Sequence, residues 1–183
     1  MNEIFKGEYL YGYRKKGKTY VNGILEFEGD FFLGKKWNGQ GFDKNKNLIY
    51  ELNNGNGKIM EYNNATNTLV FEGEYKNGQR DGKGKEYLNG KMIFEGEYKN
   101  GERDGKGKEY LNGEMIFEGE YKNGKRNGKG KEFEYGLLKF EGEFYEGLRH
   151  GKGKEYFGGS LFYEVEFKYG KLFENEKNKY FKI

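Results

Sequence analysis

The sequence predicts an all-β protein, an elongated, single-layer, twisted antiparallel sheet built from tandem β-hairpins. The first observation is a repeat: FEGEYKNG begins at Phe71, Phe94 and Phe117, returns as FEGEFYEG at Phe140, and each copy starts 23 residues after the last. The second is the pair Asn-Gly, which occurs ten times in a chain of 183 residues without proline. Asn-Gly between alternating runs is the strongest short signal for a hairpin turn, and a chain without proline keeps its backbone donors for a sheet.

The aromatic register of this repeat divides residues 1–183 into a single repeat array. Its units cover residues 5–26, 27–49, 50–70, 71–93, 94–116, 117–139 and 140–162, and a half repeat with a C-terminal cap follows over 163–183. One hairpin buries too little apolar surface to fold alone, so stability should grow with copy number and the end units should be atypical. Val165, at a central glycine position, fits that expectation.

The unit 94–116 shows how each hairpin should form. Residues 93–98 alternate between apolar or small and charged side chains, which predicts a half-solvated strand. Residues 99–105 are turn formers and long polar side chains, which predicts a loop, and a second strand should cover 106–111. Asn112-Gly113 then closes the unit as a two-residue turn, as Asn89-Gly90 closes the preceding one.

This turn fixes a register and so predicts two faces. Leu111 should oppose Glu114, Tyr110 should oppose Met115, Lys108 should oppose Phe117, and Lys106 should oppose Gly119. One face then carries Tyr110, Met115, Phe117 and Tyr121 beside Lys106 and Lys108, and the other carries Glu109, Leu111, Ile116, Glu118 and Glu120. A β-bulge in the glycine-rich strand would invert part of this assignment.

Composition narrows the function classes. The 33 basic and 30 acidic residues leave a net charge of +3, unlike most nucleic-acid binders. The chain has no cysteine, so disulfides and thiolate zinc sites are excluded, and it has neither a signal-peptide pattern at its start nor an apolar run long enough for a transmembrane helix. We expect a cytoplasmic protein, either free or at the periphery of a membrane or the cytoskeleton.

Motifs that suggest chemistry have simpler interpretations. The run 101–107 resembles a phosphate loop but has one residue too few between its glycines and lacks the Ser or Thr. His150, the single histidine, stands where sister units have Asp or Asn, and the Glu pairs of the repeat recur as a solvated strand face. The sequence therefore predicts no enzyme, no catalytic or metal-binding residues and no cofactor.

The repeat resembles the MORN (membrane occupation and recognition nexus) repeat, strongly over 71–162 and loosely over 5–70. The matching positions in one unit are Phe94, Gly96, Tyr98, Gly101, Gly105, Gly107 and Tyr110, and His150 stands at the family's frequent His position. The resemblance implies a twisted sheet of hairpins whose glycine and aromatic positions line a groove. It also implies a scaffold or targeting module that binds protein partners, with phospholipid binding proposed for some members. Most units have Tyr where the family often has Trp. The 183 residues are expected to be repeats alone, which fits either an adaptor or a piece of a larger protein.

The candidate binding residues form two sets. A partner-binding aromatic groove should contain Tyr75, Tyr87, Tyr98, Tyr110, Tyr121 and Phe144, with Tyr98 and Tyr121 open to a partner. Contacts to anionic lipid should come from two lysine ladders, Lys83, Lys85, Lys106, Lys108, Lys129, Lys131, Lys152 and Lys154. The lysines can equally lie over their own aromatic residues and keep the sheet soluble.

The favoured function is a non-enzymatic scaffold that holds a peptide or amphipathic helix of a protein partner in the aromatic groove. Two alternatives remain, a peripheral membrane module that binds anionic phospholipid through the lysines and a self-assembling structural element. Nucleic acid is an unlikely partner because the net charge is small.

Overall fold

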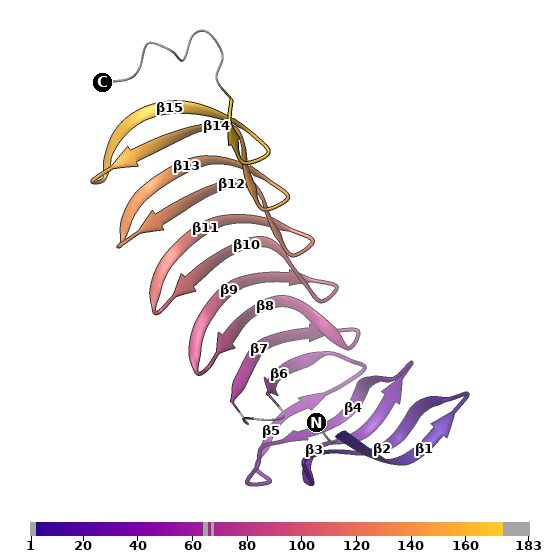
Figure 1. The fold of residues 1–183 in the computed structure, drawn as a ribbon. Coiled ribbons are helices and arrows are strands. Elements are labelled where there is room, and N and C mark those ends of the chain that lie inside the picture. The colour runs from indigo at the N-terminus through magenta and orange to yellow at the C-terminus, as the bar shows by residue number, and fades with distance from the viewer. Residues whose placement is uncertain (1–2, 64–65, 67, 174–183) are drawn as a thin grey trace. The chain divides into compact units, whose positions relative to one another are not determined.

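The structure, a computed structural model, describes residues 3–63, 66 and 68–173. Across these residues it contains sixteen strands and no helix, so the predicted all-β class is confirmed. Figure 1 shows the strands following one another as antiparallel hairpins. The alternating sequence of each repeat accounts for this, because successive side chains of a strand point to opposite faces of a sheet.

The strands are consecutive and mostly of similar length. The first eight are β1 (Glu3–Leu10), β2 (Tyr13–Val21), β3 (Ile24–Phe32), β4 (Lys35–Phe42), β5 (Leu48–Leu52), β6 (Gly57–Tyr62), β7 (Leu69–Lys76) and β8 (Gln79–Leu88). The others are β9 (Lys91–Lys99), β10 (Glu102–Leu111), β11 (Glu114–Lys122), β12 (Lys125–Glu134), β13 (Leu137–Tyr145), β14 (Leu148–Phe157), β15 (Ser160–Lys168) and β16 (Lys171–Leu172). Three are short: β5 has five residues, β6 has six and β16 has two.

The strands form two antiparallel sheets where the repeats predict one. The first sheet has the order β1-β2-β3-β4-β5, and the second contains β6 to β16 in sequence order. The break falls at the shortened third hairpin, where an isolated bridge pairs Asn53 with Asn56 between β5 and β6.

The chain divides into two compact units. The first contains the residues up to Met92 together with 98–101, and the second contains 93–97 and the residues from Glu102 onward. In the first unit a buried cluster is formed by Phe27, Phe31, Tyr50, Leu52 and Ile59. In the second unit the core is a row of phenylalanines at the first position of each repeat.

Two tight turns close each repeat, rather than one turn and one loop. The turns at Asn89-Gly90 and Asn112-Gly113 are present as predicted, with positive φ at both residues. The loop expected over 99–105 is wrong: Asn100 and Gly101 also have positive φ, of 53° and 94°, and β10 begins at Glu102. The second Asn-Gly pair is therefore a hairpin turn of its own, and the polar residues after it belong to a strand.

Backbone hydrogen bonds join successive hairpins at these turns. In the second unit the N–H of Gly124 donates to the carbonyl of Arg103 at 2.9 Å, and the N–H of Gly147 donates in the same way to Arg126 at 2.9 Å. Gly170 repeats the bond with Arg149 at 2.8 Å. Each repeat thus satisfies a turn donor with a carbonyl of the preceding repeat, which couples neighbouring units.

The structure describes the first part, up to Phe173, of the half repeat predicted over 163–183. β15 and β16 form a hairpin through the pairs Phe167↔Leu172 and Lys168↔Lys171, and the N–H of Phe173 donates to the carbonyl of Glu166 at 2.7 Å. The remainder of the expected C-terminal cap, 174–183, lies outside the described residues.

Candidate functional site

A β-bulge in each repeat reverses the expected position of the lysines. Leu111↔Glu114 and Tyr110↔Met115 pair as predicted, but the register then shifts, so that Phe117 pairs with Glu109. The prediction that lysines share a face with Phe117 and Tyr121 is therefore wrong. Lys108 pairs with Glu118 and Lys106 pairs with Glu120, because the extra residue Ile116 inverts the alternation beyond it. Equivalent shifts occur in the β12–β13 and β14–β15 hairpins.

The face that carries the aromatic row, here called the aromatic face, is closed. The side chains of Phe94, Phe117 and Phe140 are 0% exposed. Each ring lies against the glycine pair at the centre of its hairpin: a Cβ on Gly130 would come within 2.5 Å of the Phe117 ring. Glycine is required there because the ring occupies the space of a side chain. The neighbouring repeat completes the enclosure, with Phe144 meeting Phe117 edge-to-face at 5.1 Å.

Arginine covers the other side of each ring. The guanidinium carbon of Arg126 lies 4.1 Å from the centre of the Phe117 ring, and Arg149 lies 4.1 Å from that of Phe140. Arg103 covers Phe94 in the same way at 4.0 Å. Each phenylalanine is therefore held between glycine backbone and a guanidinium plane, which favours the ring through both packing and cation–π attraction.

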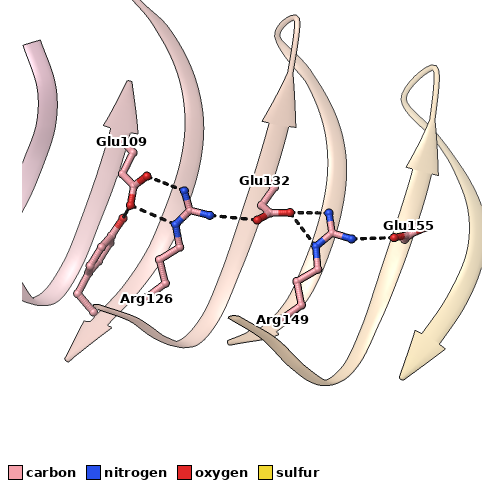
Figure 2. Close-up of polar contacts among 6 residues, drawn as sticks. Glu109, Arg126, Glu132, Arg149 and Glu155 are labelled. Carbon is pink, nitrogen blue, oxygen red and sulfur yellow. Dashed lines mark hydrogen bonds and ion pairs between the residues drawn. The ribbon is translucent and has the colours of Figure 1, made fainter. Parts of the chain in front are cut away.

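The same arginines link glutamates of successive repeats into a charged ladder (Figure 2). Arg126 donates to Glu109 from Nε at 3.1 Å and from Nη2 at 2.5 Å, and its Nη1 donates to Glu132 at 3.0 Å. Arg149 continues the ladder, donating from Nε to Glu132 at 2.8 Å and from Nη1 to Glu155 at 2.7 Å. These forked contacts use the planar geometry of guanidinium against carboxylate.

Tyr98 and Tyr121 belong to this enclosed network, so the expectation that they are open to a partner is wrong. Both are 4% exposed, and their hydroxyls donate to Glu86 at 2.7 Å and to Glu109 at 2.6 Å. Burial acts to raise the pKa of the Glu109 carboxyl, but hydrogen bonds from Arg126 and Tyr121 outweigh it and hold that pKa below its usual value.

The opposite face, here called the Lys–Glu face, carries two ladders of alternating charge in the second unit. The first consists of Lys108, Glu118, Lys131, Glu141, Lys154 and Glu164, which pair in turn across β10 to β15. The second consists of Lys106, Glu120, Lys129, Glu143, Lys152 and Glu166, and in it the N–H of Lys129 donates to Glu120 at 3.2 Å. Each strand that carries lysines on this face therefore lies next to a strand that carries glutamates.

A groove of about 790 Å³ lies on this face between the two ladders. It is lined by Glu118, Lys129, Gly130, Lys131, Glu141, Gly142, Glu143, Lys152, Gly153, Lys154, Glu164, Val165 and Glu166. The glycines supply a floor of backbone and the charged side chains supply the walls. The arrangement can hold an extended chain between walls of alternating charge.

The predicted aromatic site residues do not form one groove. Tyr75, Tyr98, Tyr121 and Phe144 lie on the aromatic face, whereas Tyr87 and Tyr110 lie on the Lys–Glu face, where their hydroxyls donate to Glu72 and Glu95 at 2.6 Å. Burial and the Glu95 carboxylate raise the pKa of Tyr110 to about 12. Lys83 and Lys85 belong to the first unit, in which Lys85 Nζ lies 3.9 Å from Glu72.

The arginines and their glutamate partners were missed by the sequence analysis. A signal for them exists, because Arg80, Arg103, Arg126 and Arg149 recur at the repeat spacing, as do Glu86, Glu109, Glu132 and Glu155. Arginines and glutamates that recur at the same spacing as the buried phenylalanines indicate that the two residue types pair with each other from repeat to repeat.

The family model of the MORN repeat matches residues 71–92, 94–114, 117–133 and 140–160. Residues 71–160 contain four MORN repeats. They include the hairpins that carry most of the arginine ladder and of the Lys–Glu face. A comparison with curated proteins finds no matching sequence.

MORN repeats form a non-enzymatic repeat family whose members often serve as interaction or membrane-associated modules. In the part of the chain that the structure describes, no three His, Cys, Asp or Glu side chains are grouped to hold a metal ion. No described helix is long and apolar enough to cross a bilayer. His150 accepts a hydrogen bond at Nδ1 from the N–H of Tyr169 at 3.4 Å, a contact within the turns.

Proposed function

We propose that this MORN-repeat protein is a non-enzymatic interaction scaffold that holds an extended segment of a protein partner in the groove of the Lys–Glu face. The groove is the observation that carries the proposal: it crosses β11 to β15, its floor is backbone, and its walls alternate in charge. A segment containing both acidic and basic residues would find complementary side chains along such walls. MORN repeats are generally involved in protein or membrane interactions, and we expect the partner of this chain to lie at a membrane or the cytoskeleton.

The two faces of the sheet also bear on the other hypotheses, which are binding to anionic lipid and binding in an aromatic groove. The groove is lined by four lysines and five glutamates, so the lysines do not create the positive surface that anionic lipid binding needs. The hypothesis of an aromatic groove has less support, because Tyr98 and Tyr121, its two expected contact residues, are each only 4% exposed. The Lys–Glu face is therefore the better candidate.

Photo-crosslinking tests the proposal. A photoreactive amino acid is placed at Lys131, in the groove wall, and separately at Lys122, an exposed residue at the end of β11. We expect discrete protein adducts from position 131 in native extract and none of these from position 122. Adducts should be lost when Glu141 and Lys154 of the same ladder are both reversed in charge. An identical adduct pattern at the two positions would contradict the groove as the binding site.

A further inference from the structure

The four successive turns from β8 to β12 all consist of an exposed Asn-Gly pair. In every one of them both residues have positive φ, and a Cβ placed on the glycine would have no atom within 4 Å beyond its chain neighbours. Turn type and exposure therefore do not distinguish the four pairs. Those that follow β9 and β11, here called the coupled turns, are Asn100-Gly101 and Asn123-Gly124, and those that follow β8 and β10, here called the uncoupled turns, are Asn89-Gly90 and Asn112-Gly113.

One backbone hydrogen bond separates the two kinds of turn. In the first coupled turn, the N–H of Gly101 donates to the carbonyl of Arg80 at 2.9 Å. In the second, the N–H of Gly124 donates to the carbonyl of Arg103 at 2.9 Å. Within the described residues, no backbone carbonyl accepts the glycine N–H of an uncoupled turn. Each compact unit contains one turn of each kind, so the two kinds can be compared inside either unit.

This hydrogen bond involves the atom that reacts when Asn-Gly deamidates. The glycine nitrogen gives up its proton and attacks Cγ of the asparagine side chain. A new C–N bond closes a succinimide ring, and the side-chain amide nitrogen takes up a proton and leaves as ammonia. Water then adds to either carbonyl carbon of the ring and opens it to aspartate or isoaspartate. Glycine favours the reaction because it has no side chain to hinder the attack.

The hydrogen bond opposes ring closure in two ways. It stabilises the glycine nitrogen in its protonated form, and it ties the turn to the neighbouring hairpin, so the bond must break before the nitrogen can rotate toward Cγ. The net contribution of one such bond corresponds to roughly twofold to tenfold in the population of the opened turn. Neither uncoupled turn has this restraint in the described structure, although its residues are as exposed as those of a coupled turn.

We propose that Asn89 and Asn112 are spontaneous deamidation sites of the folded protein, and that the backbone bonds between repeats protect Asn100 and Asn123 from the same reaction. The bonds between repeats thus have a chemical role in addition to holding successive hairpins together. The residues that line the groove of the Lys–Glu face include none from these four turns, so this proposal and the proposed function can fail independently.

The modification alters a turn that fixes strand register. Isoaspartate at position 112 adds a carbon atom to the main chain between Leu111 and Glu114, which pair directly across the turn. A two-residue turn sets the register of its strands, so a longer connection weakens the pairs next to it, and either product adds a negative charge. Isoaspartate is also the substrate of a class of carboxyl methyltransferases that use S-adenosylmethionine, which makes this product detectable.

The experiment follows the full chain at neutral pH and physiological temperature over several weeks. Peptide mapping by mass spectrometry quantifies aspartate and isoaspartate at each Asn-Gly pair, and enzymatic methylation measures isoaspartate independently. A parallel incubation in guanidinium chloride gives the rate at each pair in the unfolded chain, which removes the influence of neighbouring residues in the sequence. We expect the ratio of folded to unfolded rate to be at least about threefold higher in the uncoupled turns than in the coupled turns.

Matched variants locate the reaction. Asn89→Gly with Asn112→Gly removes the reacting side chains of the uncoupled turns. Asn100→Gly with Asn123→Gly does the same in the coupled turns. Gly-Gly suits such a turn, since Gly158-Gly159 between β14 and β15 has positive φ at both residues. The first variant should lose most of the isoaspartate that forms at these four turns in the folded chain, and the second should lose little of it.

Hydrogen exchange of the glycine amides is a second measurement, in which the coupled turns should exchange more slowly than the uncoupled turns. Equal rate ratios at the four asparagines would overturn the proposal, because the reaction would then follow global unfolding. A faster reaction in the coupled turns would also overturn it. So would the absence of product in the uncoupled turns of the folded chain when the same turns react in the denaturant.

Discussion

At the scale of single residues, Arg126 combines tasks that separate side chains usually perform. It covers the ring of Phe117, and it neutralises Glu109 and Glu132, which come from two successive repeats. Its side chain is 21% exposed, so these contacts are only partly screened by water. Tyr121, expected at first to meet a partner, instead orders Glu109 for this arginine.

Replacing Arg126 with leucine should therefore destabilise the fold. The change leaves Glu109 and Glu132 each without one charged partner and removes the cover of Phe117, for an expected loss of about 2–3 kcal/mol, below the range for fully buried pairs. Urea unfolding followed by circular dichroism measures the loss. Lys125→Leu is the control, since Lys125 pairs with Glu146 at an exposed position and should cost no more than about 1 kcal/mol. Equal losses for the two variants would show that the ladder adds nothing to stability.

At the scale of strands and hairpins, the sequence predicted more of the pairing than of the faces. The turn at Asn112-Gly113 and the pairs next to it follow from residue types alone. The bulge at Glu109 and Tyr110 does not, because it is set by the packing of Phe117 on the central glycines, a contact between strands. One extra residue moves every side chain beyond it to the opposite face of the sheet. The sequence analysis therefore placed the lysines on the wrong face and missed the arginine ladder.

The repeat can be removed as a whole because every ladder has the same period. Deleting 117–139 would join Ile116 to Phe140, bring Arg149 to Glu109 in place of Arg126, and keep lysine opposite glutamate on the other face. We expect a folded, cooperative protein of lower stability, because one interface between repeats is lost. Deleting only 117–128 should prevent folding of this region, because it removes half a hairpin and the strand direction no longer alternates. Circular dichroism and thermal melting distinguish the two outcomes, and equal spectra would contradict the shared period.

At the scale of the whole chain, the positive and negative charges nearly cancel. The net charge is +3, and the two ladders of the Lys–Glu face in the second unit contain six lysines and six glutamates. The sequence alone suggested a basic surface because the lysines were placed beside aromatic residues and the glutamates on the far side. Once the register is known, each lysine has a glutamate on an adjacent strand, and attraction to a charged membrane is cancelled locally.

We therefore expect the chain to bind phosphatidylserine-containing vesicles no better than neutral phosphatidylcholine vesicles at physiological ionic strength, when compared by co-sedimentation. The reason is that a lipid surface meets lysines and glutamates at almost equal density, and each polybasic contact to lipid requires an unopposed charge. A variant with Glu118, Glu141 and Glu164 changed to Gln is the positive control, because it leaves the lysines of the first ladder without their partners and should bind the anionic vesicles. If the unaltered chain already prefers anionic vesicles, and loses that preference when Lys129, Lys131, Lys152 and Lys154 are changed to Glu, the lysines act on lipid in spite of their neighbours. The groove would then have to be reassigned from a protein segment to a membrane surface.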